Sequence, residues 1–287
     1  MRRSSRLHGL GRSRNTARER SLRRVAGCLA LAGLIACAAC APGQPKAPPA
    51  TVLFDEGHGQ KFGADKSGEL DLSGLAALVR NQGMLVRTTH DALTDSRLSG
   101  VDAVVISGPF VPLTAAESDA LLHFLERGGR LCVMLHIAPP MGDFLHRLEV
   151  SISNGVIRER EGVIDDDPLS FQVSRLSPHE LTKNVTAFNV HGAWALLNTA
   201  DNASLTAETG PTAWVDLNAD QKLGEGDAVQ AFGVVATGHH GKGGFVVFGD
   251  DAIFQNRFLI GGNAVLGKNL AAWLGQGSAR AASQSGS

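Results

Sequence analysis

The sequence predicts an α/β fold, a mostly parallel sheet flanked by helices, with an inserted β-rich or irregular subregion. Two observations support this prediction. The short apolar runs TVLF (51–54) and FVVF (245–248) are followed at once by polar or glycine residues, as buried strands often are. Between residues 51 and 135, such runs alternate with segments of helical periodicity, a pattern typical of right-handed crossovers in a parallel sheet. With 287 residues, 43% of them hydrophobic, the chain can bury a core of this kind.

The first half of the domain supplies most of the alternation. Residues 70–82 predict a helix, because Leu72, Leu75 and Val79 recur at helical spacing and Gly83 follows as a C-terminal stop. Short strands are predicted at 84–88, 102–107 and 130–135. Thr114 and Glu117 have the spacing of a capping box, which predicts that a helix begins there and ends at the Gly128-Gly129 pair.

The second half is less regular. Over about residues 150–228, short runs punctuated by Asn and Gly replace the helical rhythm, and we predict an insertion within the domain. Residues 228–237 and 244–248, joined by GHHGKG, predict a β-hairpin. Residues 263–274 place four apolar side chains on one face and predict the closing helix. The Ser- and Ala-rich residues 276–287 predict a disordered tail.

Charge is distributed unevenly along the chain. The chain has 27 basic and 28 acidic residues, and nine Arg and one Glu lie in residues 1–36. The remainder therefore has 18 basic and 27 acidic residues, a net charge of about −9. Binding to nucleic acid needs clusters of Lys and Arg, and none remains after residue 36. Nucleic acid is therefore excluded as an expected partner.

The N-terminal segment is predicted to be a lipoprotein signal peptide, residues 1–36. An Arg-rich stretch precedes a twelve-residue apolar run, too short for a comfortable membrane span. Leu34-Ile35-Ala36-Cys37 resembles a bacterial lipobox, so Cys37 is the predicted lipidation site. Two alternatives remain, lipidation at Cys40 or cleavage near Ala41 without a lipid. The expected localisation is the cell envelope, exported and lipid-anchored on the periplasmic face, and Ala38 favours the outer membrane if the bacterium is diderm.

Residues 37–50 contain the Pro-rich stretch PGQPKAPP and predict an extended tether between a membrane surface and the domain at 51–275. Within that domain Cys132 is the single cysteine. A disulfide scaffold is excluded there, and Cys132 is expected to be an inert thiol of the core.

Four motifs, in this order, carry a family resemblance: VLFDEGHGQ (52–60), VDAVVISGP (101–109), FLERGGRLCVML (124–135) and GGFVVFGDDAIFQNRFL (243–259). The chain resembles the glutamine-amidotransferase-like domains of uncharacterised bacterial envelope lipoproteins, over residues 51–275. It is also similar to the extracytoplasmic domain of gliding-motility ABC-transporter auxiliary proteins. The resemblance implies a flavodoxin-like or amidotransferase-like sheet.

The resemblance also bears on chemistry. In class I amidotransferases the strand that matches residues 130–135 leads to a sharp turn that carries a Cys nucleophile. His136 stands at that position here, within the sequence LHIAP (135–139), and no Cys or Ser is present. Amidotransferase chemistry is therefore not expected.

Polar side chains follow the predicted strand ends, the edge at which α/β sheets form sites. This rim set is Asp55, His58, Gln60, His136, Asp250 and Asn256. In a hydrolase, a rim histidine could act as a general base oriented by an aspartate, and the same residue types could hold a divalent metal. Alternatively, these groups cap helices, satisfy loop amides and bond to one another, or bind a ligand.

Two further patterns suggest metals. Asp216, Asn218, Asp220, Lys222 (through its carbonyl) and Asp227 match the ligand spacing of calcium loops, although Gln221 stands where Gly is preferred and position 12 is Asp rather than Glu. The alternative is a solvated polar loop. His239 and His240 form an adjacent pair in a Gly-rich turn, a pattern that more often reflects exposure than metal binding. Ca²⁺ is the one cofactor that the sequence suggests.

Together these observations predict a cell-envelope lipoprotein whose amidotransferase-like domain binds a ligand or a protein without a reaction of its own. Its expected partners are the membrane, through the lipid anchor, and an envelope protein or transporter. A hydrolase that uses the rim His and Asp residues, and an accessory subunit of an envelope ABC transporter, are the alternatives.

Overall fold

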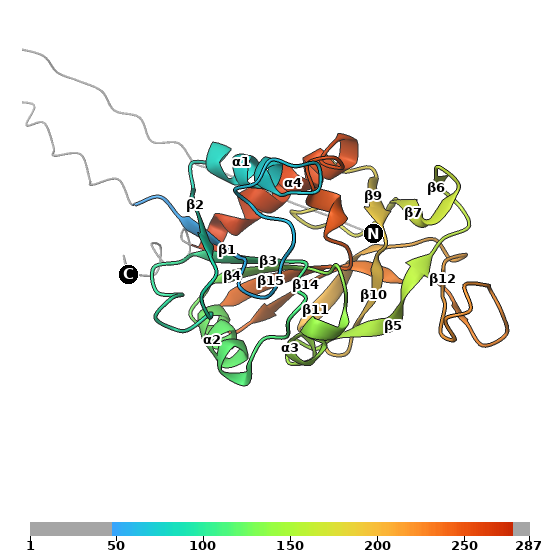
Figure 1. Ribbon diagram of the computed structural model, residues 1–287, viewed down its shortest axis with the longest axis horizontal. Coiled ribbons are helices and arrows are strands. Elements are labelled where there is room, and N and C mark those ends of the chain that lie inside the picture. Colours follow the sequence, from blue (N-terminus) through green and yellow to red (C-terminus); the bar gives the residue numbers. More distant parts are fainter. Residues whose placement is uncertain (1–47, 278–287) are drawn as a thin grey trace, which may run out of the picture. The chain divides into compact units, whose positions relative to one another are not determined.

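The structure is a computed structural model that describes residues 48–277 (Figure 1). The predicted signal peptide, Cys37, most of the tether and the C-terminal tail lie outside the described residues. Within the described part of the chain, no helix combines the length and the apolar character of a membrane-spanning segment.

Five parallel strands form one half of the main sheet. They lie in the order β15-β4-β3-β1-β2, and every neighbouring pair is parallel. Their bounds are β1 Thr51–Asp55, β2 Leu85–Thr89, β3 Ala103–Ser107, β4 Arg130–Met134 and β15 Gly243–Phe248. All residues of β1, β3, β4 and β15 are buried, which explains why their sequences are almost continuously apolar. The predicted strands are present to within a residue or two.

The strand order separates the two strands that begin and end the parallel half in sequence, at 51–54 and 245–248. Strands β4 and β3 lie between β15 and β1. Their carboxyl ends still share one edge of the sheet, because all four strands are parallel.

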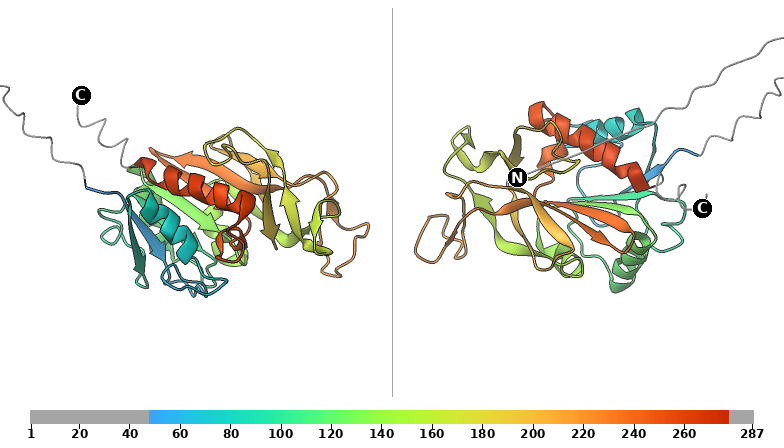
Figure 2. Two further views of the ribbon diagram at one scale, coloured as in Figure 1. Left: turned by 90° about the horizontal axis from the view of Figure 1, so that it is seen from above. Right: turned by 180° about the vertical axis from the view of Figure 1, so that it is seen from behind.

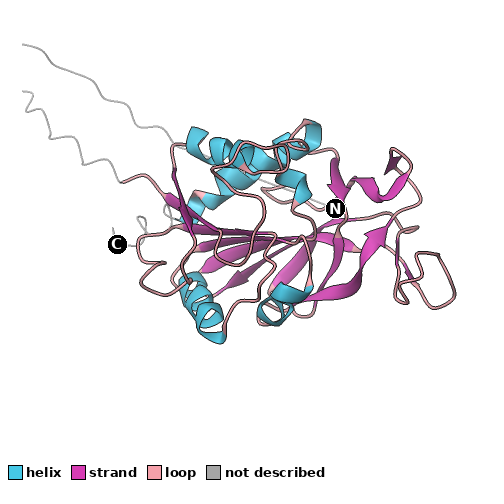
Figure 3. Ribbon diagram, viewed as in Figure 1, coloured by secondary structure: helices cyan, strands magenta, loops and turns pink. Residues whose placement is uncertain are grey.

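Antiparallel strands extend the sheet beyond β15, so it is mixed rather than mostly parallel. The extension runs through β14 (Gly233–His240), β10 (Trp194–Asn198), β5 (Val150–Arg158), β12 (Trp214–Val215) and β13 (Ala228–Val229), with β11 (Ala203–Glu208) and β8 (Arg175–Leu176) attached to it. A separate three-stranded sheet contains β6 (Val163–Ile164), β7 (Asp167–Val173) and β9 (Phe188–His191). Residues 150–228 are thus rich in β-strands, and several of these strands continue the main sheet (Figure 3).

The predicted hairpin is present with a different first arm. Strand β14 begins at Gly233 rather than at residue 228 and continues to His240, where β15 follows after two residues. Gly241 takes the first turn position with φ +58°, as a tight primed hairpin turn requires. His239 and His240 therefore belong to a strand and not to a Gly-rich loop.

Helices cover both faces of the parallel strands. Helices α1 (Ser73–Asn81) and α4 (Gly261–Leu274) lie side by side on one face, while α2 (Ala115–Glu126) and the short α3 (Gly142–His146) lie on the other (Figures 1 and 2). Two one-turn 3₁₀ helices, η1 (Pro139–Met141) and η2 (Ala252–Phe254), follow β4 and β15. The predicted helices are present, and the capping box of Thr114 and Glu117 is formed in both directions.

Two apolar clusters form the core, one on each side of the sheet. Leu75, Val79 and Leu270 pack against one face, and Leu121 and Leu125 against the other. Cys132 is fully buried within β4 and is a free thiol, as expected, and burial raises the pKa of that thiol.

Candidate functional site

The six rim residues lie at or beyond the carboxyl ends of β1, β4 and β15, but they do not form one cluster. They divide into three groups with different partners: Asp55, His58 and Gln60 after β1; His136 after β4; and Asp250 and Asn256 after β15.

The first group is a buried ion-pair cluster. The His58 ring lies between two carboxylates, with Nδ1 2.8 Å from Asp55 Oδ2 and Nε2 3.1 Å from Glu117 Oε1. Gln60 completes this hydrogen-bond network: its side-chain NH₂ donates to Asp55 at 2.6 Å, and its side-chain oxygen accepts the His58 backbone N–H at 2.7 Å. We call Asp55, His58, Gln60 and Glu117 the Glu117 cluster. Since both ring nitrogens face carboxylate oxygens, both donate, and the imidazole is charged.

The electrostatics agree with this geometry. Burial opposes the charge on His58, yet its hydrogen bond and ion pair with Asp55, together with Glu117, raise its pKa above 6.5. Burial likewise opposes ionisation of Glu117, but hydrogen bonds from Thr114 and Leu93 and the charge of His58 lower its pKa from 4.5 to about 2. His58 is only 5% exposed. The Glu117 cluster therefore joins the β1 loop to the start of α2 and offers little free donor or acceptor capacity to a ligand.

The third group also serves the fold. Asp250 is buried and accepts backbone N–H groups from His191 at 2.6 Å and from Ala252 at 2.8 Å. Burial, and next the charge of Asp251, raise the pKa of Asp250 to about 7. Asn256 accepts the Gly74 N–H at 2.7 Å and so caps the first turn of α1.

The second group is the open one. His136 Nδ1 lies 3.1 Å from Asp251 Oδ1, and the side chain of His136 is 40% exposed whereas that of Asp251 is 2% exposed. The hydrogen bond that His136 donates to Asp251 raises the pKa of His136, and the charges of Asp251 and Asp250 act in the same direction against partial burial. Among the described residues, Nε2 of His136 has no hydrogen-bond partner, so it is available to a ligand.

Aromatic side chains surround this histidine. The rings of Phe62 and Phe110 have centroids 5.7 Å and 5.3 Å from the imidazole, and the indole of Trp194 donates to the His136 carbonyl at 3.2 Å. Lys61 places its ammonium 5.5 Å from the Phe110 ring. The His136 surface, formed by His136, Asp251, Phe62, Phe110 and Lys61, therefore combines a positive donor with apolar walls.

Gly108 forms the floor beneath the histidine and its aspartate. A Cβ at Gly108 would stand 2.5 Å from Asp251 Oδ2 and 3.2 Å from His136 Cβ, and the residue has φ +57°. Two buried polar atoms close to it, Asp251 Oδ2 and Ser107 Oγ, have no hydrogen-bond partner in the described residues. Such buried atoms are rare in folded proteins and are often found at functional sites.

Neither Asp251 nor Glu117 is among the site residues that the sequence predicts. The adjacent pair Asp250-Asp251 indicates that an aspartate lies at the rim, but the sequence does not show which of the two side chains faces His136. For Glu117 the capping-box spacing was clear, while its second role as the partner of His58 depends on a contact across 59 residues.

The loop with calcium-type spacing holds its oxygens differently. Asp216 accepts the Gln221 N–H at 2.8 Å, Asp220 accepts the Lys222 N–H at 2.8 Å, and Asp227 accepts two further loop amides. Asn218 accepts the Asp220 N–H at 3.0 Å. In residues 48–277, no three His, Cys, Asp or Glu side chains gather closely enough to hold a metal ion. Calcium binding stays a prediction from the spacing alone.

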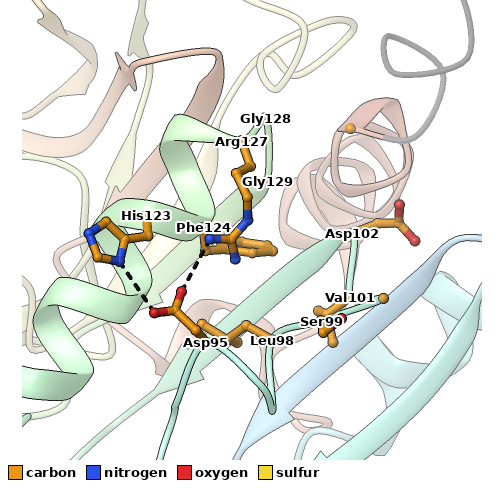
Figure 4. Close-up of a pocket in the computed structure, with 12 residues that line it drawn as sticks. Asp95, Leu98, Ser99, Val101, Asp102, His123, Phe124, Arg127, Gly128 and Gly129 are labelled. Carbon is orange, nitrogen blue, oxygen red and sulfur yellow. Dashed lines mark hydrogen bonds and ion pairs between the residues drawn. The ribbon is translucent and has the colours of Figure 1, made fainter. Parts of the chain in front are cut away.

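A pocket of about 430 Å³ lies at the opposite, amino-terminal edge of the parallel strands and contains none of the rim residues (Figure 4). Its charged side chains have partners within the fold: Asp95 pairs with His123 at 3.3 Å and with Arg127 at 3.1 Å, and all three are more than half exposed. Asp102 accepts the Thr51 backbone N–H at 2.7 Å. The candidate site is therefore the His136 surface rather than this pocket.

Comparison with known families gives a match over residues 67–271 to the model described as "Domain of unknown function (DUF4350)". The chain belongs to the DUF4350 family. This match covers most of the described part of the chain, including every strand of the parallel half except β1. A comparison with curated proteins finds no match.

Solved structures with TM-scores above 0.5 share the overall fold of this DUF4350 domain. The mmIFT52 N-terminal domain is 18% identical with a TM-score of 0.62, covering 78% of this chain and 96% of its own. Cytoplasmic protein STM1381 from Salmonella typhimurium LT2 is 12% identical with a TM-score of 0.51, covering 78% and 99%. A protein described as ThuA-like from Bacteroides uniformis ATCC 8492 is 16% identical, with a TM-score of 0.49 and coverage of 81% and 94%. The predicted amidotransferase-like fold is supported at the level of an α/β sheet flanked by helices.

Proposed function

We propose that this DUF4350 protein is a lipid-anchored protein of the bacterial cell envelope whose domain binds a ligand or a protein segment at the His136 surface, without a reaction of its own. One observation carries the proposal. Of the six rim residues, His136 alone has an exposed side chain, and a buried carboxylate holds its ring in a fixed orientation.

The chemistry of the surface indicates what it binds. The raised pKa of His136 keeps its ring protonated to a higher pH than an ordinary imidazole, and in the charged form Nε2 can donate to an anionic or carbonyl oxygen. Phe62 and Phe110 offer apolar contact beside it, and Lys61 adds a second positive charge. An acidic group attached to an apolar or ring-shaped body would match both features.

A photo-crosslinking experiment in intact bacteria tests this proposal. Val111 is 51% exposed next to Phe110, whereas Leu85 is 46% exposed on β2, at the opposite edge of the sheet. A photoreactive amino acid at position 111 should give a defined adduct, and the same residue at position 85 should not. His136→Ala in the position 111 background should remove most of the adduct, while His146→Ala, an exposed histidine on α3, should not. Equal labelling at 111 and 85 would refute binding at the His136 surface.

The His136–Asp251 pair also favours a second function, a hydrolase in which His136 is a general base oriented by Asp251. The absence of a Cys or Ser at position 136 argues against covalent catalysis of the amidotransferase kind. Alanine at His136 or Asp251 separates the two functions. If turnover of an envelope-derived substrate is lost while the circular dichroism spectrum and melting temperature are retained, the binding function without catalysis is wrong.

The envelope location rests on the lipobox-like sequence ahead of Cys37 and the Pro-rich residues that follow it. An accessory role with an envelope ABC transporter fits the same location. That role predicts that a permease co-purifies with the protein after extraction in mild detergent, and repeated recovery without one would exclude it.

A further inference from the structure

An unpaired arginine lies on the antiparallel extension, where β10, β5 and β12 are neighbouring strands (Figure 1). Arg158 ends β5, and its guanidinium carbon lies 5.6 Å from the centre of the Trp214 ring. Among the described residues this half-buried guanidinium has no hydrogen bond or ion pair, and its Nε atom is buried without a partner. Asp216, the acidic residue that follows β12, accepts the Gln221 N–H instead. No contact within the described fold therefore compensates the charge of Arg158.

Arg158 shares one face of the sheet with Trp194 of β10. Side chains alternate along a strand, and Ile157 of β5 belongs to the core cluster on one side, so Val156 and Arg158 point to the other side. Both neighbours of Trp194 in the sequence also belong to that core cluster, so Trp194 points away from it too. Trp194 lies directly opposite Val156 in the pairing of β10 with β5.

Trp194 connects this face to the His136 surface, because its indole N–H donates to the His136 carbonyl at 3.2 Å. Val156 lies one strand further on, about 5 Å away, and Arg158 lies two residues along β5, about 7 Å beyond it. His136 and Arg158 are thus separated by on the order of 15 Å. Helix α3 packs against β5, yet Asn154 is exposed, and Trp194, Val156 and Arg158 are partly exposed. We call these last three residues the Arg158 strip.

Charge and polarity indicate which kind of ligand fits. His136 in its charged form lies at one end and Arg158 at the other, so a ligand with an acidic group at each end is complementary. The middle offers little hydrogen bonding, because the Trp194 N–H is already used and Val156 is apolar. The hydroxyl groups of a saccharide would lose their partners there, whereas apolar side chains of a peptide would not.

We propose that the His136 surface and the Arg158 strip together bind one extended segment of a second protein. The segment has two acidic side chains, one for His136 and one for Arg158, and apolar residues between them that contact Trp194 and Val156. An extended chain covers about 15 Å in four or five residues, which sets the spacing of the two acidic residues. This inference rests on the proposed function and specifies the partner of the same site.

Photo-crosslinking in intact bacteria tests the proposal. A photoreactive amino acid at position 154 should give an adduct with the same protein as position 111 does, and His136→Ala should remove both adducts. Mass spectrometry of the crosslinked peptide should show two acidic residues about four or five positions apart. An adduct without a peptide, or with a peptide that lacks this acidic pair, would overturn the proposal.

The two positions separate this inference from the proposed function. An adduct at position 111 without one at position 154 would overturn the extended segment and leave binding at the His136 surface intact. An adduct at position 154 that persists in His136→Ala would show a separate site and would also overturn the extended segment. Absence of adducts at both positions would refute both.

Variants of Arg158 test its role. Arg158→Gln should reduce the adduct at position 154 about twofold to fivefold, the loss expected from one partly exposed ion pair. Arg158→Lys keeps the charge and should retain most of the adduct. Arg175→Gln is the matched control, because it removes an exposed arginine on β8, and it should leave the yield unchanged. Circular dichroism and melting temperatures show whether each variant is folded. Equal yields in wild type and folded Arg158→Gln, or equal losses in Arg158→Lys and Arg158→Gln, would overturn the proposal.

Discussion

Asp250 and Asp251 are adjacent in sequence and equally buried, yet they face different partners. Asp250 points to the backbone N–H groups of His191 and Ala252, while Asp251 points to the ring of His136. The difference arises because the chain turns into η2 directly after β15, so the two side chains leave the backbone in different directions. Asp250 therefore stabilises the fold, whereas Asp251 orients the ring of His136 at the candidate site.

Gly108 is expected to tolerate no side chain. Gly108→Ala should lower the free energy of unfolding by about 2–4 kcal/mol, because the left-handed φ and the contact with Asp251 both oppose a Cβ. Gly100→Ala is the matched control: φ there is +72° but no atom lies near a Cβ, so a loss of about 1 kcal/mol is expected. Urea denaturation measures both, and equal losses would show that the Asp251 contact is unimportant.

Asp251 is expected to control the titration of His136. Asp251→Asn should lower the pKa of His136 relative to the wild-type protein, because the hydrogen bond and the negative charge that raise it are both weakened. NMR of the imidazole protons between pH 4 and pH 9 measures the shift. Asp143→Asn, which removes an exposed carboxylate on α3, serves as the control. An unchanged pKa in Asp251→Asn would mean that the pair does not interact in solution.

At the scale of elements, one side chain connects two pieces of structure. Glu117 caps α2 through Thr114 and also accepts from the Leu93 backbone and faces His58 in the β1 loop. The loop that bears His58 is further tied to the segment after β3, because the N–H groups of Phe110 and Val111 donate to the His58 carbonyl. The Glu117 cluster thereby positions Phe110, which packs on His136, without itself being exposed.

The Glu117 cluster predicts an acid-sensitive contribution to stability. The pKa of Glu117 is about 2 in the folded protein and 4.5 as its ordinary value, so its contribution is present above pH 4.5 and is lost as the pH falls toward 2. The pKa of His58 is raised instead, so its contribution is present below pH 6.5 and is lost as the pH rises through its folded pKa. The cluster is thus strongest between these limits.

Glu117→Gln is therefore expected to lower the free energy of unfolding by about 2–3 kcal/mol at pH 5–6 and to flatten its decline below pH 4.5. Melting temperatures from pH 2 to pH 7 measure this dependence. Asp119→Asn, two residues away in an exposed ion pair with Arg147, should change stability by less than about 1 kcal/mol. Parallel pH profiles for wild type and Glu117→Gln would contradict the prediction.

At the scale of the whole molecule, the mixed sheet separates the His136 surface from a pocket of about 480 Å³. The carboxyl ends of the parallel strands carry the His136 surface, and the amino ends of β4 and β15 meet this pocket. Because β14 is antiparallel to β15, the end of β14 brings Thr237 and His239 to the pocket edge. The antiparallel extension thus supplies side chains that an all-parallel sheet would not place there.

The proposed anchor gives a prediction for the intact protein in its host. Cys37→Ala should release the protein from the membrane fraction and abolish incorporation of labelled fatty acid, because one acyl-modified residue is the proposed attachment. Cys40→Ala should change neither. Membrane fractionation and metabolic labelling provide the measurements. Loss of label in Cys40→Ala alone would move the site to Cys40, and retention of label in both single variants would exclude both assignments.

Local patterns in the sequence determined most of the regular structure. The apolar runs of β1, β3, β4 and β15, the helical spacing of α1 and α4, and the capping box of α2 depend on neighbours within a few residues, and each was predicted close to its observed bounds. The rim residues were also found, because a parallel strand must end at a shared edge.

Tertiary structure alone decided which of those residues meet. The pairing of His58 with Glu117 spans 59 residues, and that of His136 with Asp251 spans 115, distances over which sequence periodicity carries no information. The strand order and the antiparallel extension likewise follow from packing between distant segments. The sequence therefore identified the edge of the sheet, while three-dimensional packing selected His136 as its open side chain and Asp251 as the carboxylate behind it.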